Sequence, residues 1–225
     1  PSVLQWARET SGLSFNDVAR VLNRKSITAE TVAAWERGDG SPSYSQLEEL
    51  AYQIFKRPLA LFFFPEPPWE ETPKQSFRTL PEYALERLSV RMRYLVRQAK
   101  TMQFNLMELY EGNNPSKRQI VKDLKLSPDT PISEAVFAVR KYINIDLKEQ
   151  CAWNNTEKAF KVWRKAFEEC GIFVFKEAFK DEPFSGFCLY DDQFPIITVN
   201  NSKSDTRQVF TLFHELPSFV RNGWD

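Results

Sequence analysis

Residues 28–38 decide the fold of the N-terminal part of the chain, and they read Thr-Ala-Glu-Thr-Val-Ala-Ala-Trp-Glu-Arg-Gly. The spacing of Val32 and Trp35 places both side chains on one face of a helix that runs from about Thr28 to Arg37. Gly38 favours the end of that helix, because glycine adopts the left-handed backbone conformation without steric cost. The stretch therefore predicts a short helix with a buried apolar face and a polar outer face.

Other short helices are expected around this one. Ser14 and Asp17 have the spacing of a capping box, which marks the start of a second helix that precedes the one at 28–37. The remaining helices are indicated by apolar residues at helical spacing, around Leu4 and Ala7, from about Ser45 to Ile54, and from about Pro58. Residues 23–26 form a polar turn between the second and third helices, an arrangement typical of a helix-turn-helix that reads the major groove of DNA.

Residues 1–64 resemble the XRE/Cro-like family of repressors. The resemblance is carried by Leu13-Ser14, Val18-Ala19, Leu22, the run 31–38 and Pro42-Ser43-Tyr44-Ser45-Gln46-Leu47. It implies a five-helix DNA-binding domain of the helix-turn-helix type, with an operator as its ligand.

Two sets of candidate DNA contacts follow from the geometry of this motif. The set expected to face base edges is Thr28, Glu30, Thr31 and Ala34. The set expected to reach phosphates is Arg24, Lys25, Arg37 and Ser43. The alternative is that Arg24 and Lys25 form a solvated turn and that Arg37 pairs with Glu36 or Asp39.

Charge balance limits how strongly this domain is expected to bind DNA. Residues 1–64 contain seven basic and seven acidic residues, and the whole chain contains 30 of each. General attraction to nucleic acid is therefore weak, and useful affinity would need a dimer on paired half-sites or a partner protein.

Length and composition place the chain among folded proteins with two or three units. Its 225 residues are 42% hydrophobic, which is sufficient for a substantial core. Cys151, Cys170 and Cys188 are widely spaced and odd in number, so they favour reduced thiols over a disulfide framework. With no apolar run long enough for a membrane and no signal peptide, we expect a soluble, cytoplasmic protein without a membrane partner.

Residues 65–74 mark the boundary of the first domain, because they read Pro-Glu-Pro-Pro-Trp-Glu-Glu-Thr-Pro-Lys and cannot continue a helix. We assign residues 65–80 to a linker. The apolar run 59–64 just before it is expected to be buried. The sequence of residues 57–65, followed by Phe77-Arg78, resembles the junction at which an XRE domain precedes an ImmA/IrrE-type zinc peptidase domain.

Residues 81–170 are expected to be helical. A long amphipathic helix from about Glu82 to Glu111 is indicated by an apolar stripe, Leu85, Leu88, Met92, Leu95, Ala99, Met102, Leu106 and Leu109. Further helices are predicted at 132–144 and 156–170. In the last of these, Phe160, Trp163 and Phe167 are interpreted as core residues.

After Gly171 the pattern changes to short runs typical of strands, at 172–175, 186–190 and 196–200. These strands and the following run 207–216 closely resemble the ImmA/IrrE family of zinc metallopeptidases. The predicted fold class is therefore mainly α, with the helix-turn-helix domain followed by an α+β, zincin-like domain at 171–225 that contains a small sheet.

His214 is the only histidine, and it opens the string His-Glu-Leu-Pro-Ser. The resemblance makes His214 a metal ligand and Glu215 the general base of an HExxH motif, in which a second histidine one turn later completes the grip on zinc. Ser218 occupies that second position, and Pro217 disfavours a continuous helix. Because the sequence ends at Asp225, we expect a truncated domain, a broken motif and no cofactor in this chain, although intact family members hold Zn²⁺.

A deletion of two nucleotides after the Leu216 codon would turn Leu-Gly-His-Leu-Leu-Phe into Leu-Pro-Ser-Phe-Val, which matches residues 216–220. The rival hypothesis is a chain that was shortened by design. Either history is expected to leave Phe219, Val220 and Trp224 as an exposed apolar tail that favours self-association or a bound partner.

The leading functional hypothesis is a DNA-binding transcriptional regulator, antitoxin-like in character, whose inactive peptidase-like domain senses a signal or binds a partner. Expected partners are operator DNA, a second copy of the chain, and a toxin or repressor protein. One alternative is a zinc endopeptidase that cleaves a repressor. The other is a protein-binding antitoxin that does not bind DNA.

Overall fold

The computed structural model describes residues 1–70, 88–180 and 183–220. The chain divides into two compact units, one made of residues 1–75 and 80–94 and the other of residues 76–79 and 95–225. It is mainly helical and contains one small sheet, as the sequence predicts. The linker residues 71–80, the expected helix start at 82–87 and Trp224 lie outside the described residues.

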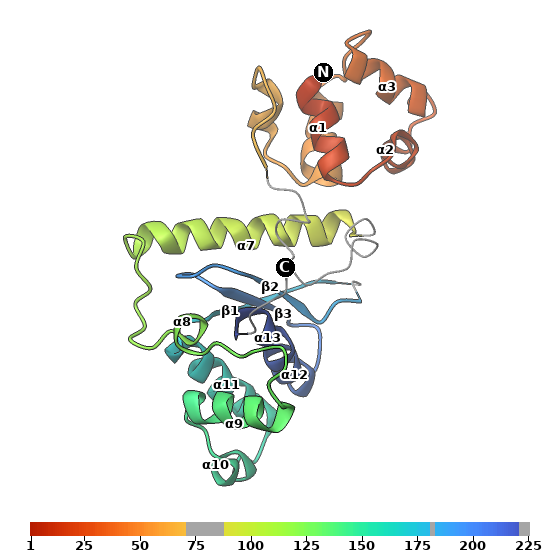
Figure 1. Cartoon of the computed structure of the whole chain (residues 1–225). Coiled ribbons are helices and arrows are strands. Elements are labelled where there is room, and N and C mark those ends of the chain that lie inside the picture. Colours follow the sequence, from red (N-terminus) through yellow and green to blue (C-terminus); the bar gives the residue numbers. More distant parts are fainter. Residues whose placement is uncertain (71–87, 181–182, 221–225) are drawn as a thin grey trace. The chain divides into compact units, whose positions relative to one another are not determined.

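The described part of the first unit begins with short helices at the predicted places (Figure 1). They are α1 (Ser2–Thr10), α2 (Phe15–Leu22), α3 (Ala29–Arg37), α4 (Tyr44–Glu49), the π-helical η1 (Leu50–Phe55) and the 3₁₀-helical η2 (Leu59–Phe63). The capping box of Ser14 and Asp17 at the start of α2 is confirmed. Gly38 ends α3 with a φ of 85°, in the left-handed region that glycine tolerates.

The core of the first unit forms where the apolar faces of these helices meet. Val32 and Trp35 are buried, as predicted, and pack with residues of the other helices and with Ile27 of the α2–α3 connection; the helical residues are Leu4, Ala7, Val18, Leu22, Leu50, Ile54 and Phe55. The prediction that the whole run 59–64 is buried is wrong, because Phe63 and Phe64 are 64% and 50% exposed. Only part of that run faces the core, where the ring of Phe62 stacks on Phe55 at a centroid distance of 6.1 Å.

Helix α7 (Val90–Leu109) is the long amphipathic helix expected from the sequence, but it begins later. Leu88 and Ser89 precede it in a non-helical conformation, and the Ser89 hydroxyl accepts a hydrogen bond from the Met92 backbone N–H at 3.0 Å. This serine satisfies an N–H group that a helix start leaves without a partner. Met92 of the predicted apolar stripe is buried, whereas Leu109 at the end of the stripe is 70% exposed.

The second unit contains a three-stranded sheet with the order β1-β3-β2. Its strands are β1 (Phe173–Glu177), β2 (Gly186–Leu189) and β3 (Ile196–Asn200), close to the predicted positions. Strand β3 is central, parallel to β1 and antiparallel to β2. All residues of β3 are buried, so it forms the centre of this unit.

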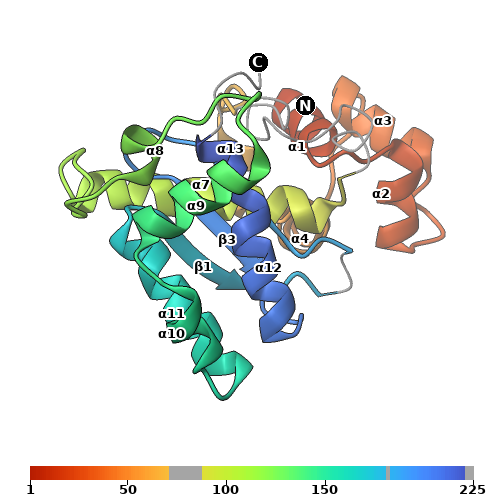
Figure 2. The same ribbon diagram turned by 60° about the horizontal axis from the view of Figure 1, so that its bottom comes forward.

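Helices cover both faces of this sheet. The helices of the second unit are the second-unit part of α7, then α8 (Ile120–Asp123), α9 (Ile132–Ile143), α10 (Leu147–Cys151), α11 (Thr156–Glu169), α12 (Asp205–Glu215) and α13 (Pro217–Val220). Helices α11 and α12 lie on one face, and α12 runs beside β3 (Figure 2). Helix α7 lies on the other face (Figure 1), and its Gln103 donates a hydrogen bond to the Phe194 carbonyl at 2.8 Å.

The core of the second unit confirms the interpretation of Phe160, Trp163 and Phe167, which are all nearly fully buried. The expectation of an exposed tail is wrong at Phe219 and Val220, which are each only 2% exposed. The physical reason is α13, which carries both side chains into the core and places the Val220 carbonyl where Leu126 donates a hydrogen bond to it at 2.8 Å.

All three cysteines are free thiols; Cys170 and Cys188 are buried and Cys151 is exposed. Within residues 1–70, 88–180 and 183–220, no helix combines the length and apolar character that crossing a bilayer requires.

Candidate functional site

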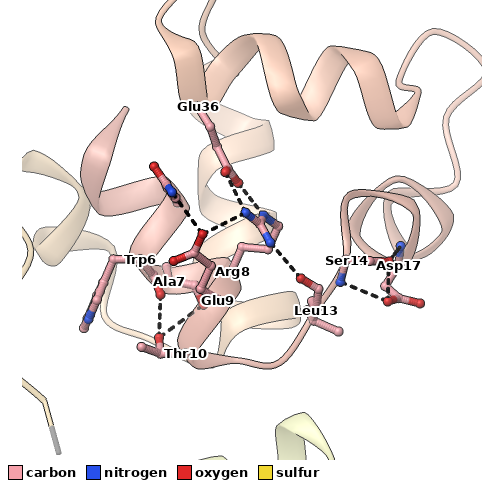
Figure 3. Close-up of polar contacts among 10 residues, drawn as sticks. Trp6, Ala7, Arg8, Glu9, Thr10, Leu13, Ser14, Asp17 and Glu36 are labelled. Atoms are coloured by element: carbon pink, nitrogen blue, oxygen red, sulfur yellow. Dashed lines mark hydrogen bonds and ion pairs between the residues drawn. The ribbon is translucent and has the colours of Figure 1, made fainter. Parts of the chain in front are cut away.

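A part-buried ion pair joins the first and third helices of the N-terminal unit (Figure 3). Arg8 donates from Nε to Glu36 Oε1 at 2.7 Å and from Nη2 to Glu36 Oε2 at 2.9 Å. Its Nη1 donates to the Leu13 carbonyl at 3.0 Å, and its guanidinium lies 4.2 Å from the centre of the Phe15 ring. The hydrogen bond to Glu36 raises the pKa of Arg8 above its ordinary value. This two-point contact fixes both the position and the rotation of α3.

The outer face of α3 is polar and accessible to solvent. Val32 and Trp35 face inward, whereas Glu30 and Arg37 are exposed and Ala34 is half-buried. A helix fixed on its inner side with short or polar residues on its outer side is the kind of element that enters a DNA groove.

Two of the residues expected to face bases form the N-terminal cap of α3. The Thr31 backbone N–H donates to Thr28 Oγ1 at 3.3 Å, and the Thr28 backbone N–H donates to Thr31 Oγ1 at 3.2 Å. Both hydroxyl groups therefore satisfy the start of the helix. Of this predicted set, Glu30 and Ala34 have no such capping role.

The residues expected to reach phosphates differ in their surroundings. Arg24 pairs with Glu49 at 2.7 Å, and Arg37 pairs with Glu30 at 2.7 Å and with Asp39 at 2.8 Å. The pairing of Arg37 with Asp39, which the sequence left open, is present, whereas the carboxylate of Glu36 is taken by Arg8.

Ser43 and Lys25 complete this set. Ser43 caps α4 by accepting a hydrogen bond from the Gln46 backbone N–H at 3.3 Å. Lys25 is exposed, and no ion pair of Lys25 occurs among the described residues. The structure thus brings the predicted DNA contacts onto one short segment of the first unit, with most of their polar groups already in use.

A second cluster lies where α12 ends. His214 is exposed and its ring stacks on Phe210 at a centroid distance of 5.8 Å. Glu215 is half-buried and, together with Ser218 of α13, lies near the Cys188 thiol on β2. Pro217 starts α13 instead of continuing α12, a position that suits proline because the first helical residue needs no N–H partner.

The low polarity of this cluster disfavours charge on its acidic groups. Burial raises the pKa of the Glu215 carboxyl, and the Cys188 hydrogen bond and nearby His214 offset only part of that rise. Burial also raises the pKa of the Cys188 thiol, and the charge of Glu215 adds to it. Such a thiol stays protonated at neutral pH and is a poor nucleophile.

The donor set of this cluster does not fit a zinc ion. Zinc sites in proteins use three or four protein ligands, most often thiolate, imidazole or carboxylate groups. Among the residues that the structure describes, no three histidine, cysteine, aspartate or glutamate side chains are grouped to hold a metal. Within the described part of the chain, His214 and Glu215 therefore lack the further ligands that a zinc site requires.

Comparison with known proteins gives one finding. The model of the Peptidase_M78 family, described as the IrrE N-terminal-like domain, matches residues 167–223. This stretch covers the sheet, α12 and α13 and supports the predicted likeness of that region to an ImmA/IrrE-type metallopeptidase domain, a family that is typically zinc-dependent. No significant match was found among curated proteins or among solved structures.

Sequence reasoning missed Cys188 as a neighbour of Glu215 and missed the Arg8–Glu36 pair. Arg8 follows the buried Ala7, and Glu36 follows the buried Trp35, so each lies at the edge of an apolar helix face. A charge at such an edge is a weak signal for a buried ion pair, but it does not identify the partner across 28 residues of chain.

Replacing Glu36 with Ala should destabilise the first unit by about 1–3 kcal/mol, because the part-buried guanidinium of Arg8 loses both of its hydrogen bonds to that carboxylate. Urea denaturation followed by circular dichroism measures the change. The matched control is Glu48→Ala on the same unit, where an exposed carboxylate is removed and a change within about 0.5 kcal/mol is expected. Equal effects of the two substitutions would contradict the assigned role of the pair.

Replacing Glu215 with Gln should raise the free energy of unfolding relative to that of the wild type, and this difference should grow as the pH rises. The pKa of Glu215 is higher in the folded state than in the unfolded state, so the folded state binds more protons between these two pKa values. The stability of the wild type therefore decreases as the pH rises through that range. Glutamine does not titrate, so its advantage over the wild type should grow across that window. Urea unfolding at about pH 4 and about pH 8 tests this, with the exposed Glu134→Gln as control; a difference that does not change with pH counts against it.

The purified chain should contain far less than one zinc per molecule after mild chelation, because His214 and Glu215 do not suffice as ligands. Elemental analysis of the wild type and of His214→Ala should give the same low value. A stoichiometric zinc that His214→Ala removes would contradict this expectation and would require ligands from outside the described residues, including those of another chain.

Proposed function

We propose that the chain is a DNA-binding transcriptional regulator and that its first unit is a helix-turn-helix domain of the XRE/Cro-like type. The observation that carries the proposal is the setting of α3. Its inner face is held by the Arg8–Glu36 pair and by Val32 and Trp35, while its outer face is exposed and follows a polar turn from α2. This is the arrangement that a recognition helix needs.

The charge of the first unit favours binding as a dimer. Its basic and acidic residues balance up to residue 64, so a single copy has little general attraction to DNA. Two copies on paired half-sites double the number of phosphate contacts and raise affinity without a change in the contacts of each copy. Operator DNA and a second copy of the chain are therefore the proposed partners.

The second unit is proposed to sense a signal or bind a protein partner, such as a toxin or repressor, instead of cutting peptides. Its family match and its buried sheet support a folded peptidase-like domain. Its described residues lack a zinc-ligand group, so catalysis by this chain alone has no support from its side chains.

Each alternative has one observation in its favour. The match of residues 167–223 to a peptidase family favours a zinc endopeptidase, which would need ligands beyond His214. The ion pairs of Arg24 and Arg37 favour a protein-binding antitoxin without DNA affinity, because both guanidinium groups already have carboxylate partners.

The double substitution Arg24→Ala and Lys25→Ala should weaken binding to the DNA upstream of the gene by about tenfold and lower the salt slope of binding by about two, because two phosphate contacts are lost. Fluorescence anisotropy of the full chain with that duplex and with a scrambled one, across a salt series, measures both quantities.

The control for this experiment is Lys148→Ala together with Lys141→Ala, which removes the same charge from exposed sites of the second unit. It should leave binding close to that of the wild type. Equal losses in both double variants, or no wild-type binding to either duplex, would overturn the proposed interface.

A further inference from the structure

Arg37 is held between two carboxylates on the outer face of α3. Its Nη2 donates to Glu30 Oε1 at 2.7 Å and its Nε donates to Asp39 Oδ2 at 2.8 Å. Glu30 lies two helical turns before Arg37, and Asp39 follows the glycine that ends the helix. The three side chains are between 53% and 78% exposed, so they form a surface cluster and have no core-packing role that would account for the pairing.

This cluster places negative charge where a phosphate would approach. Hydrogen bonds from Arg37 to Asp39 and then to Glu30 raise its pKa, which shows that both carboxylates favour its charged form. A phosphate would have to displace them from the same donors while being repelled by them. Exposed ion pairs are individually weak, so the exchange is possible but lowers the net gain.

The other arginines near the turn are paired as well. Arg20 contacts Asp17 at 2.6 Å and Arg24 contacts Glu49 at 2.7 Å. Arg37 differs from them because two carboxylates hold it and because both of those groups lie on or next to α3 itself. Neutralising these two groups therefore changes the proposed DNA-facing surface directly.

We propose that Glu30 and Asp39 form a carboxylate latch on Arg37 that lowers the affinity of α3 for the phosphate backbone of any DNA duplex. This inference rests on the proposed DNA-binding function. The latch sets a low basal affinity for a single copy, so stable binding depends on the simultaneous docking of two copies. Glu30 and Asp39 are then affinity-limiting residues and Arg37 is the phosphate contact that they restrain.

The test is the double variant Glu30→Gln and Asp39→Asn in the full chain, measured by fluorescence anisotropy with random-sequence and upstream duplexes. Binding to both should tighten by about five- to tenfold at about 0.1 M salt, and the salt slope should become steeper by about one, as one more phosphate contact forms. Adding Arg37→Ala to this variant should abolish the gain.

The control is Glu48→Gln with Glu66→Gln, which removes two exposed acidic charges elsewhere on the same unit. If this control tightens binding as much, or if the gain persists with Arg37→Ala, the latch is wrong while the DNA-binding function stands. If the wild type binds and the latch variant binds no more tightly, the latch is also wrong. If no variant binds DNA, the proposed function itself fails. Circular dichroism confirms that each variant is folded.

Discussion

The bidentate ion pair between Arg8 and Glu36 is the contact on which the arrangement of the first unit depends. It joins α1 to α3 through two hydrogen bonds in a part-buried setting, where an unpaired charge would be costly. Because the guanidinium is planar and forked, it fixes the rotation of α3 as well as its position. The outer face of α3, with Glu30 and Arg37, is exposed as a direct result.

Aromatic packing has the corresponding role at the end of α12. The Phe213 ring meets Trp163 and Phe167 edge-on at centroid distances of 4.8 and 5.4 Å. Helical geometry then turns the next residue, His214, toward solvent, where it stacks on Phe210. The histidine is thus exposed on its helix, and among the described residues it is not part of any group of three side chains that could hold a metal.

The sequence predicted those features that depend on neighbouring residues. Capping at Ser14, the stop at Gly38 and the strands around residues 172–200 follow from local chemistry and periodicity. Contacts between distant residues could not be predicted from local sequence patterns. The packing of Phe219 of α13 into the core was therefore missed. The roles of Thr28 and Thr31 were incomplete for another reason: a threonine at a helix start has two competing uses, and spacing alone does not separate capping from base contact.

Hydrogen–deuterium exchange of the full chain, with and without the duplex from upstream of its gene, tests most directly whether α3 is the DNA-binding element. If α3 binds DNA, peptides that cover residues 24–39 should exchange more slowly when DNA is present, with little change in those from 156–220. Protection confined to the second unit, or none at saturating DNA, would contradict it. The measurement locates the bound surface without any substitution, so loss of folding cannot be mistaken for loss of contact.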